Sequence, residues 1–368
     1  MLQILGDLMR CKALTKLVDY LKYKSNVDDG VRPLSRDKSK SFEISTDKFH
    51  EFKAPKNCRI AFVDGGNQEI IGTPKISIQF NRICFSIFKG KEHEKRNSKI
   101  PRKIEFLSVT CAELKNGEIH YETKLFPLKE EYKRFLPHDE HLSFTSKKRA
   151  TTFHDLSRVE SISRRFAELS FSKYVLEKEL SKDDILVKDG SLQVTFSKED
   201  KYLESCLDVA SKNNLYFLGI SKTCRRITNS GVPLIRALQH CSKKVGKKRW
   251  CYYPLEEYNL NNHKITVGAV KFSPESRIFR FDIYSPKSKI LEILSAIVPN
   301  TQDSFIHGYP YGLVKVDSEA RVRKNEVEIF KARLLQLIHK YGELKENILA
   351  DMRAVDMHDI LDENSLLW

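Results

Sequence analysis

Two aspartates in this sequence stand where an apolar run meets a glycine. Asp64 follows the run 59–63, and Asp189 follows a second run over 185–188. Each run has the length and β-branched content of a buried strand, and Asp-Gly is a frequent turn pair. We therefore expect both carboxylates at strand ends, where α/β proteins build many of their sites. One such pair is more often an ordinary turn, but two in one chain favour a shared site.

Two further carboxylates could join this pair. Glu168 lies in a helical pattern over about 155–180, and its plainer interpretation is a surface glutamate on a charged helix. Asp317 precedes a helical pattern that starts at Ser318, so it could equally be a helix N-cap. Clustered carboxylates raise one another's pKa unless a cation neutralises them, and a cysteine-free oxygen cluster suits Mg²⁺ or Mn²⁺. Such ions promote phosphodiester hydrolysis, so these residues predict a metal-dependent nuclease.

A lysine and a tyrosine could complete such a site. Lys222 comes just after the strand expected over 215–220, where it could meet a phosphate or a leaving oxygen, or simply be solvated. Tyr309 lies in the glycine-rich and tyrosine-rich segment 308–317, where it could orient water or a phosphate, or only pack. Both residues are therefore candidates for the catalytic set.

The net charge favours a polyanionic partner. Lys and Arg total 64 against 49 Asp and Glu, a formal charge of +15. Nucleic acid is the first candidate partner, an anionic membrane surface the second, and a merely basic surface the alternative. The densest basic segment, followed closely by Tyr252 and Tyr253, could bind a DNA strand by charge and stacking. Its candidate DNA-binding residues are Lys243, Lys244, Lys247, Lys248, Arg249 and Trp250.

The cysteines and the hydropathy pattern bear on the compartment. None of the eight cysteines forms a CxxC pair, which favours reduced thiols in an intracellular protein. No apolar run approaches the length of a membrane span, and the N-terminus lacks the apolar core of a signal peptide. We expect a cytoplasmic protein without membrane contact.

Strand and helix patterns alternate along the chain, which predicts an α/β fold with a mixed β-sheet flanked by helices and helical extensions at both ends. Strands are expected over 59–63, 75–87, 104–110, 185–189, 215–220, 265–272 and 278–283. Helices are expected over 3–23, 155–180, 198–211, 287–297, 318–341 and 344–360. We divide the chain into a helix and linker (1–45), a main domain (46–345) with a polar insert at about 120–150, and a helical tail (346–368).

Five short motifs follow one another along the main domain. They are Val-Asp-Gly-Gly from 63, Arg-Arg-x-x-Glu from 164, Asp-Gly-Ser-Leu from 189, Gly-Ile-Ser-Lys from 219, and Gly-Tyr-Pro-Tyr-Gly-Leu-Val-x-x-Asp from 308. In this order they resemble the NurA family of prokaryotic, mostly archaeal, DNA end-processing nucleases. The resemblance extends over about 58–330.

The resemblance implies an RNase H-like core and a Mn²⁺-dependent (or Mg²⁺-dependent) nuclease. Its members are 5′-to-3′ exonucleases with single-strand endonuclease activity, and they act as homodimers with a hexameric HerA-type translocase in DNA end resection, which implies association with the nucleoid. Asp64, Glu168 and Asp189 match the acidic metal ligands of the family, and Tyr309 matches its active-site tyrosine. Asp317 stands where many members have histidine. Aspartate is also a hard oxygen ligand, so metal binding is expected to survive the exchange.

Two alternatives come from other functional classes. An actin-like phosphotransferase shares the RNase H-like topology and also places Asp-Gly turns on phosphates, but the chain lacks a glycine-rich adenosine-binding stretch. A non-catalytic DNA-binding adaptor would need only the basic charge and the terminal helices. Loss of Asp64 would leave an adaptor intact, which separates it from a nuclease.

Overall fold

The computed structural model describes residues 12–24, 30–35, 39–95, 97–146, 157–287 and 289–353. The strands in these ranges are β1 (Ser39–Ser41), β2 (Phe49–His50), β3 (Arg59–Gly72), β4 (Ile76–Lys89), β5 (Glu92–His93), β6 (Lys103–Lys115), β7 (Glu118–Pro127), β8 (Phe144–Thr145), β9 (Ile185–Asp189), β10 (Tyr216–Ser221), β11 (Trp250–Leu260), β12 (His263–Lys271) and β13 (Phe279–Tyr284).

The helices are α2 (Lys12–Lys24), α3 (Asp139–Leu142), α4 (Ser157–Lys178), α5 (Glu199–Asn213), α6 (Leu234–Val245), α7 (Ile290–Ile297), α8 (Tyr311–Ala320), α9 (Lys324–Ile338) and α10 (Gly342–Arg353). Short 3-10 turns are η1 (Thr46–Lys48), η2 (Glu130–Phe135), η3 (Val298–Thr301) and η4 (Ser304–Ile306).

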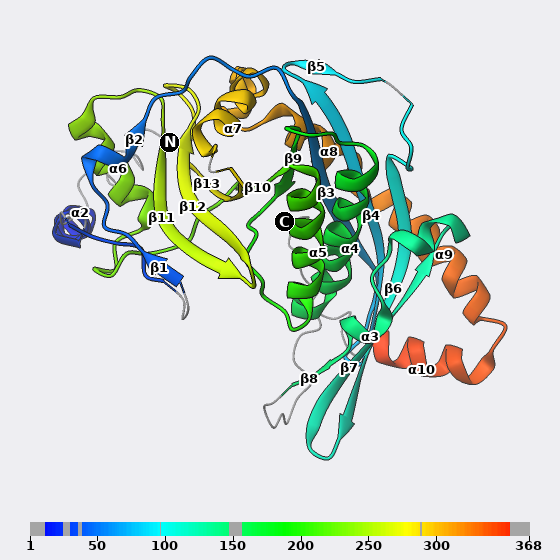
Figure 1. The fold of residues 1–368 in the computed structure, drawn as a ribbon. Helices are drawn as coiled ribbons and strands as arrows, with labels where there is room; N and C mark the ends of the chain where they lie inside the picture. The colour runs from blue at the N-terminus through cyan, green and yellow to red at the C-terminus, as the bar shows by residue number, and fades with distance from the viewer. Residues whose placement is uncertain are drawn as a thin grey trace, which may run out of the picture.

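One mixed sheet runs through the described chain (Figure 1), with the strand order β1-β11-β12-β13-β10-β9-β3-β4-β6-β7-β8. At its centre β6, β4 and β3 are antiparallel neighbours, and β9 and β10 then continue the sheet parallel to β3. Helices α4 and α5 make the connections into β9 and β10. Three antiparallel strands followed by two parallel ones form an RNase H-like core, so the predicted fold class is confirmed.

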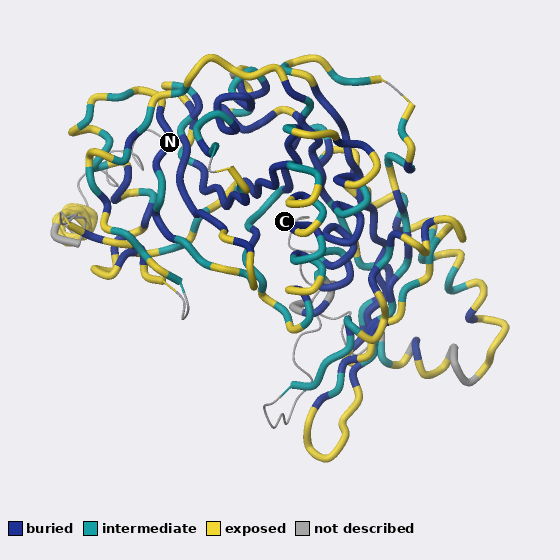
Figure 2. Tube along the Cα trace, in the orientation of Figure 1, coloured by how far each residue is buried: buried dark blue, intermediate teal, exposed yellow. Residues whose placement is uncertain are grey.

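Helices cover both faces of the central strands, which Figure 2 shows as buried. On one face α4 and α5 pack against a cluster that includes Val63 and Phe217. On the other face α7 and α8 pack against a cluster that includes Phe62 and Leu218. Successive side chains of a strand point to opposite faces, so a strand buried on both faces is apolar at consecutive positions. This explains the unbroken apolar run before Asp64.

The prediction that Asp64 ends a strand is wrong. Strand β3 continues to Gly72, and β4 pairs with it through Gly65 and Gly66. The glycine at 66 instead permits close packing, because an added Cβ would lie 2.3 Å from the Ala320 carbonyl oxygen. The prediction holds for Asp189, the last residue of β9, because Gly190 after it adopts a φ of +90°.

Asp317 is not the N-cap of a helix beginning at Ser318. It lies inside α8, which already begins at Tyr311 after Pro310. The Asn300 side chain accepts a hydrogen bond from the Gly312 backbone N–H at 2.7 Å, which satisfies a donor in the first turn of α8. The predicted helix over 318–341 is therefore two helices, the end of α8 and then α9.

The stretch 120–150 is more regular than a polar insert, because it contains most of β7 together with η2, α3 and β8. The alternation in β7 was hidden by Thr123, which is buried and shares a hydrogen bond of 3.0 Å with Thr110. Strand β11 was not predicted at all. Pro254 interrupts it, and its pairing with β12 shifts register between Tyr252 and Glu256.

At the N-terminal end the predicted helix is present as α2, and its first nine residues lie outside the described ranges. Strand β1 pairs with β11, so part of the predicted linker joins the sheet. At the other end α10 covers the start of the predicted tail, and residues from 354 onward are outside the described ranges. The division into domains stays a prediction.

Within the described ranges, no helix combines the length and apolar character that crossing a membrane requires. None of the seven cysteines in these ranges forms a disulfide.

Candidate active site

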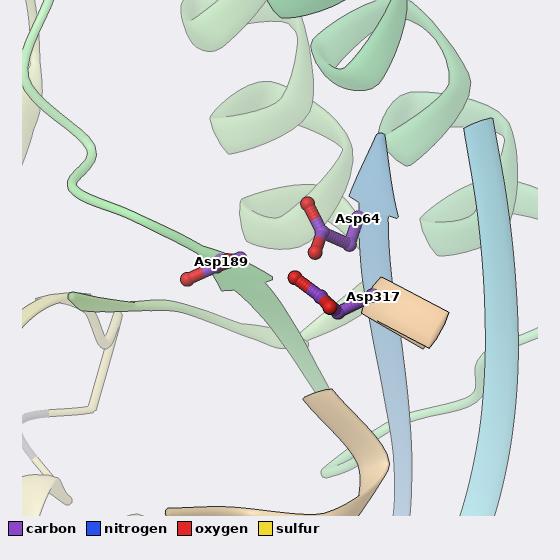
Figure 3. Close-up of side chains that lie close together, drawn as sticks. All are labelled: Asp64, Asp189 and Asp317. Atoms are coloured by element: carbon purple, nitrogen blue, oxygen red, sulfur yellow. The ribbon is translucent and has the colours of Figure 1, made fainter. Parts of the chain in front are cut away.

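Three carboxylates converge at one point of the sheet (Figure 3). Asp64 comes from the middle of β3, Asp189 from the end of β9, and Asp317 from α8. One carboxylate oxygen of each lies within 4.8 Å of the others. Three hard oxygen donors at this spacing fit a divalent cation of the Mg²⁺ or Mn²⁺ type.

Strand register and helix packing create this convergence. In the parallel pair β3 and β9, Val63 faces Lys188, so the next residues along, Asp64 and Asp189, are neighbours at the same level of the sheet. Helix α8 packs on the same region of β3, and the close approach at Gly66 brings its last turns down to the strand. Asp317 is carried to the two aspartates in this way.

Lys222 lies among the three carboxylates. Its Nζ is 2.7 Å from Asp189 Oδ2 and 2.5 Å from Asp317 Oδ1. Burial alone would lower the pKa of Lys222, but Asp189 and the other carboxylates raise it above its usual range, so the ammonium keeps its charge. When Asp64 is ionised as well, the three carboxylates and the one ammonium carry a surplus of two negative charges, which matches a divalent cation.

Asp64 is the most perturbed of the three. Its side chain is buried, and its Oδ1 accepts a hydrogen bond of 2.8 Å from the Gly65 backbone N–H. Burial, followed by the negative charges of Glu168 and Asp189, raises the pKa of Asp64 to about 8. Without a cation this carboxyl therefore holds a proton at neutral pH, and a cation that binds there must displace it.

This pKa predicts a pH-dependent stability in the absence of divalent ions. Between about pH 4 and pH 8 the folded chain keeps the Asp64 proton that the unfolded chain loses, so the free energy of unfolding falls as pH rises. Asp64→Asn removes this penalty. In EDTA we expect its gain in melting temperature over the wild type to be larger at pH 9 than at pH 5, by about 2 °C or more.

Asp183→Asn is the control for this melting experiment, because the pKa of Asp183 is shifted in the opposite direction. Burial raises this pKa slightly, but Tyr216 and Lys56 hold it below its usual value. It should show no gain that grows with pH. An equal gain for Asp64→Asn at both pH values would contradict the raised pKa.

Glu168 adjoins Asp64 but is engaged by two cations. Its Oε2 is 2.7 Å from Lys188 Nζ, and its Oε1 is paired with Arg164 one helical turn away. Although burial favours the neutral form, Lys188 and Arg164 hold the pKa of Glu168 below its usual range. Its carboxylate is therefore charged and contributes to the raised pKa of Asp64. Its role as a metal ligand stays a prediction.

Tyr309 is buried next to Asp189. Its hydroxyl donates a hydrogen bond of 2.8 Å to Asp189 Oδ1, and its ring packs on Phe279 with centroids 5.1 Å apart. Burial, and then the neighbouring Asp189 carboxylate, raise the pKa of the Tyr309 hydroxyl well above its usual value. The hydroxyl stays protonated and fixes the orientation of the Asp189 carboxylate.

Two residues of this site had no predicted role. Arg164 pairs with Glu168 and also donates a hydrogen bond of 3.2 Å to the Gly65 carbonyl oxygen, so it links α4 to β3. The spacing of four between Arg164 and Glu168 on a helix was the available signal. Lys188 is the one charged residue in the apolar run before Asp189, and a lysine at such a position needs a buried partner.

The basic segment 243–249 lies apart from the acidic site. It spans the end of α6 and the turn into β11, and β11 is four strands away from β9 in the sheet, roughly 20 Å at the usual strand spacing. Lys243, Lys244, Lys248 and Arg249 are exposed. Lys247 is partly buried and donates a hydrogen bond of 3.1 Å to the Phe49 carbonyl oxygen.

The expectation that Trp250 stacks on DNA is wrong, because its side chain is fully buried. The same holds for Tyr252. Both rings pack against Phe49 in the core beneath α6, with centroid distances of 4.9 and 4.8 Å. An aromatic residue after a basic run is compatible with either a surface or a core position, and here the strand β11 turns both inward.

Several solved structures are similar in fold to this chain. The crystal structure of the NurA nuclease from Sulfolobus solfataricus superposes with a TM-score of 0.49 at 15% identity, over 92% of this chain and 98% of that one. A second NurA crystal structure gives 0.46 at 8% identity, over 94% and 99% of the two chains. The catalytic domain of human endonuclease V gives 0.32 at 11% identity, over 72% and 81%. Among curated proteins, none is detectably similar in sequence to this chain.

The family comparison covers most of the molecule. A family model described as NurA domain matches residues 58–322, a range that includes β3, β9, α8 and all three aspartates. The resemblance expected from the five motifs is thereby confirmed: the chain belongs to the NurA family.

Proposed function

We propose that the protein is a DNA nuclease that depends on Mn²⁺ or Mg²⁺. The observation that carries this proposal is the convergence of Asp64, Asp189 and Asp317 around Lys222 in a chain of the NurA family. The formal charge of +15 favours a nucleic acid as the substrate.

Asp64, Asp189 and Asp317 would hold the metal. When bound there, the metal supplies Lewis-acid activation of water and neutralises charge on the scissile phosphate. Lys222 would steady the charge that builds on the phosphate oxygens, because its ammonium stays protonated and already lies at the carboxylates. Tyr309 would keep the Asp189 carboxylate in one orientation through its hydrogen bond.

Membership of the NurA family supports a finer proposal about the activity. We propose 5′-to-3′ exonuclease activity on single- and double-stranded DNA, with endonuclease activity on single strands. We also propose that a homodimer works with a HerA-type hexameric translocase in double-strand-break end resection at the nucleoid. Glu168, although paired with Arg164 and Lys188, would support the metal site as a further ligand or through its charge.

The test is digestion of end-labelled single- and double-stranded DNA with Mn²⁺, with Mg²⁺ and with EDTA. We expect products with either metal and none with EDTA, because three clustered carboxylates cannot act on a phosphodiester without a cation between them. The label at the 5′ or 3′ end reports the direction of digestion. Failure to cut DNA with either metal, even with a HerA-type translocase present, would favour the adaptor alternative.

The basic segment yields a separate prediction about DNA binding. Replacing exposed Lys243 and Lys248 by Glu should weaken DNA binding about tenfold at moderate salt, because two phosphate contacts become repulsive. The dependence of the affinity on salt should flatten accordingly. The measurement is fluorescence anisotropy with labelled DNA in EDTA at several salt concentrations.

A matched pair controls for net charge in that experiment. Lys115 and Lys124 lie exposed on β6 and β7, and their replacement by Glu changes the charge of the chain by the same amount. Equal weakening by both pairs would mean that only the overall charge matters and would remove the segment from the DNA-binding surface.

A further inference from the structure

A cavity lies between α4, α5 and the segment that contains η2 and α3, and none of the three aspartates lines it. Its volume is about 240 Å³. The cations at its lining are Arg134 from η2, Lys173 from α4 and Lys201 from α5, and none of its lining residues is acidic. Three separate elements thus each contribute one cation to the same small space.

These cations are available to a ligand. Across the described ranges, no ion pair engages the side chains of Arg134, Lys173 or Lys201. Other lysines on the same elements are paired, such as Lys133 with Glu130 at 3.8 Å and Lys178 with Glu177 at 3.3 Å. None of the three cations that line the cavity is therefore neutralised by an ion pair within the described ranges.

The walls of the cavity are held in place by aromatic and histidine side chains. The Tyr202 hydroxyl lies 2.8 Å from His141 Nδ1 and accepts a hydrogen bond of 3.0 Å from the His138 backbone N–H. The Tyr202 ring packs on Phe166 with centroids 5.3 Å apart, and the Tyr174 ring packs on Phe135 at 4.9 Å. These contacts fix α3 and η2 on the two helices, so the cavity is preformed.

The potential in the cavity is positive. Burial, followed by the charges of Lys201, His138 and Lys198, lowers the pKa of His141, while nearby Glu140 opposes this shift only weakly. A cavity with this potential attracts an anion with several oxygen acceptors. An arginine fork and two ammonium groups are the donors that phosphate groups select.

We propose that this cavity binds the phosphate of a nucleotide. Its volume is below the roughly 300–1,000 Å³ of pockets that enclose drug-sized ligands, so the cavity takes the phosphate and an adjoining part of one nucleotide. The tyrosine and histidine rings at the wall offer flat surfaces to a sugar or base. The choice of a nucleotide over other phosphate esters rests on the proposed nuclease function, whereas the phosphate site itself follows from the lining residues.

The test measures binding of 5′-dTMP, thymidine and inorganic phosphate to the full chain by isothermal titration calorimetry. EDTA is present throughout, so that no metal at the aspartates can hold the phosphate. The wild type should bind 5′-dTMP and, more weakly, inorganic phosphate, but not thymidine. The triple variant Arg134→Ala, Lys173→Ala, Lys201→Ala should bind 5′-dTMP about tenfold or more weakly, because all three charged donors are lost.

A matched triple variant separates this cavity from the general charge. Lys133→Ala, Lys178→Ala and Lys212→Ala remove three lysines from the same three elements, η2, α4 and α5, outside the cavity. Its affinity for 5′-dTMP should stay within about twofold of the wild type. Both triples change exposed or half-exposed side chains, and their melting temperatures show whether the fold is retained.

Several outcomes of these binding measurements would overturn the proposal. Equal loss of binding in both triples, or unchanged binding in the cavity triple, overturns the proposal. So does binding that Asp189→Asn abolishes, because the nucleotide would then lie at the aspartates. Binding of phosphate without preference for 5′-dTMP keeps an anion site but overturns the nucleotide assignment, whatever the outcome of the DNA digestion assay. A 5′-phosphorylated oligothymidylate that competes with 5′-dTMP identifies a DNA strand as the source of the nucleotide; failure to compete identifies a free nucleotide.

Discussion

Asp189→Asn is expected to lower the rate of DNA cleavage by at least about 10³-fold while leaving the fold intact. Asp189 lies at the centre of the acidic group: it contacts Lys222, accepts the Tyr309 hydrogen bond and neighbours both other aspartates. An amide keeps the shape of this side chain but removes the charge that would hold a divalent cation. Tyr309 can still donate to the amide oxygen, so the hydroxyl keeps a partner.

The measurement is the single-turnover rate on end-labelled DNA with Mn²⁺, together with the affinity for Mn²⁺ by calorimetry. Asp183→Asn is the matched control, because Asp183 lies two residues before the opposite end of the same strand and pairs there with Lys56 at 3.4 Å. It should retain the wild-type rate within about twofold. A rate for Asp189→Asn within tenfold of the wild type would mean that the three aspartates are not the catalytic metal site.

Gly66→Ala is expected to impair both stability and activity. The new Cβ would lie 2.3 Å from the Ala320 carbonyl oxygen and 2.9 Å from its carbonyl carbon, so α8 must move away from β3. Overpacking of this kind costs about 1–3 kcal/mol of unfolding free energy. Asp317 lies one turn before Ala320, and a displacement of about 1 Å at a catalytic group can lower a rate by about 100-fold.

Chemical denaturation and the same cleavage assay test this prediction below the unfolding transition. Gly342→Ala provides the control, since a Cβ there has no heavy atom within 4 Å. A glycine-to-alanine change in a helix stabilises by up to about 1 kcal/mol, so the control should not lose stability. Full activity and an unchanged midpoint for Gly66→Ala would show that α8 can shift without cost and that its close packing does not position Asp317.

The sequence identified the residues of the site, but it predicted the secondary structure around them less well. Asp64, Asp189, Lys222 and Asp317 were selected as residues near strand ends or helix starts, and they do meet in the structure. Their types and order along the chain were enough, because hard cation sites are built from few residue types. The expected backbone setting was also right for Asp189, which ends β9, and for Lys222, which directly follows β10.

What sequence reasoning missed depends on contacts between distant segments. In the sequence, the glycines after Asp64 look like a turn. Only the approach of the Ala320 backbone explains why the strand needs a residue without a side chain at position 66. Trp250 looks like a stacking residue after a basic run, and only the packing of β11 beneath α6 shows that it is core. Local pattern cannot specify which of two compatible environments tertiary packing selects.

The long separation of the site residues along the chain has a consequence for the synthesis of the protein. Tyr309 is 120 residues from Asp189, and Asp317 is 95 residues from Lys222. A ribosome that adds about 5–20 residues per second therefore exposes Asp64 and Asp189 many seconds before α8 emerges. A growing chain can build the central strands in that time, but it holds only two of the three aspartates. A chain interrupted before α8 therefore contains the strands β1 to β13 but lacks Asp317, so its acidic group is incomplete.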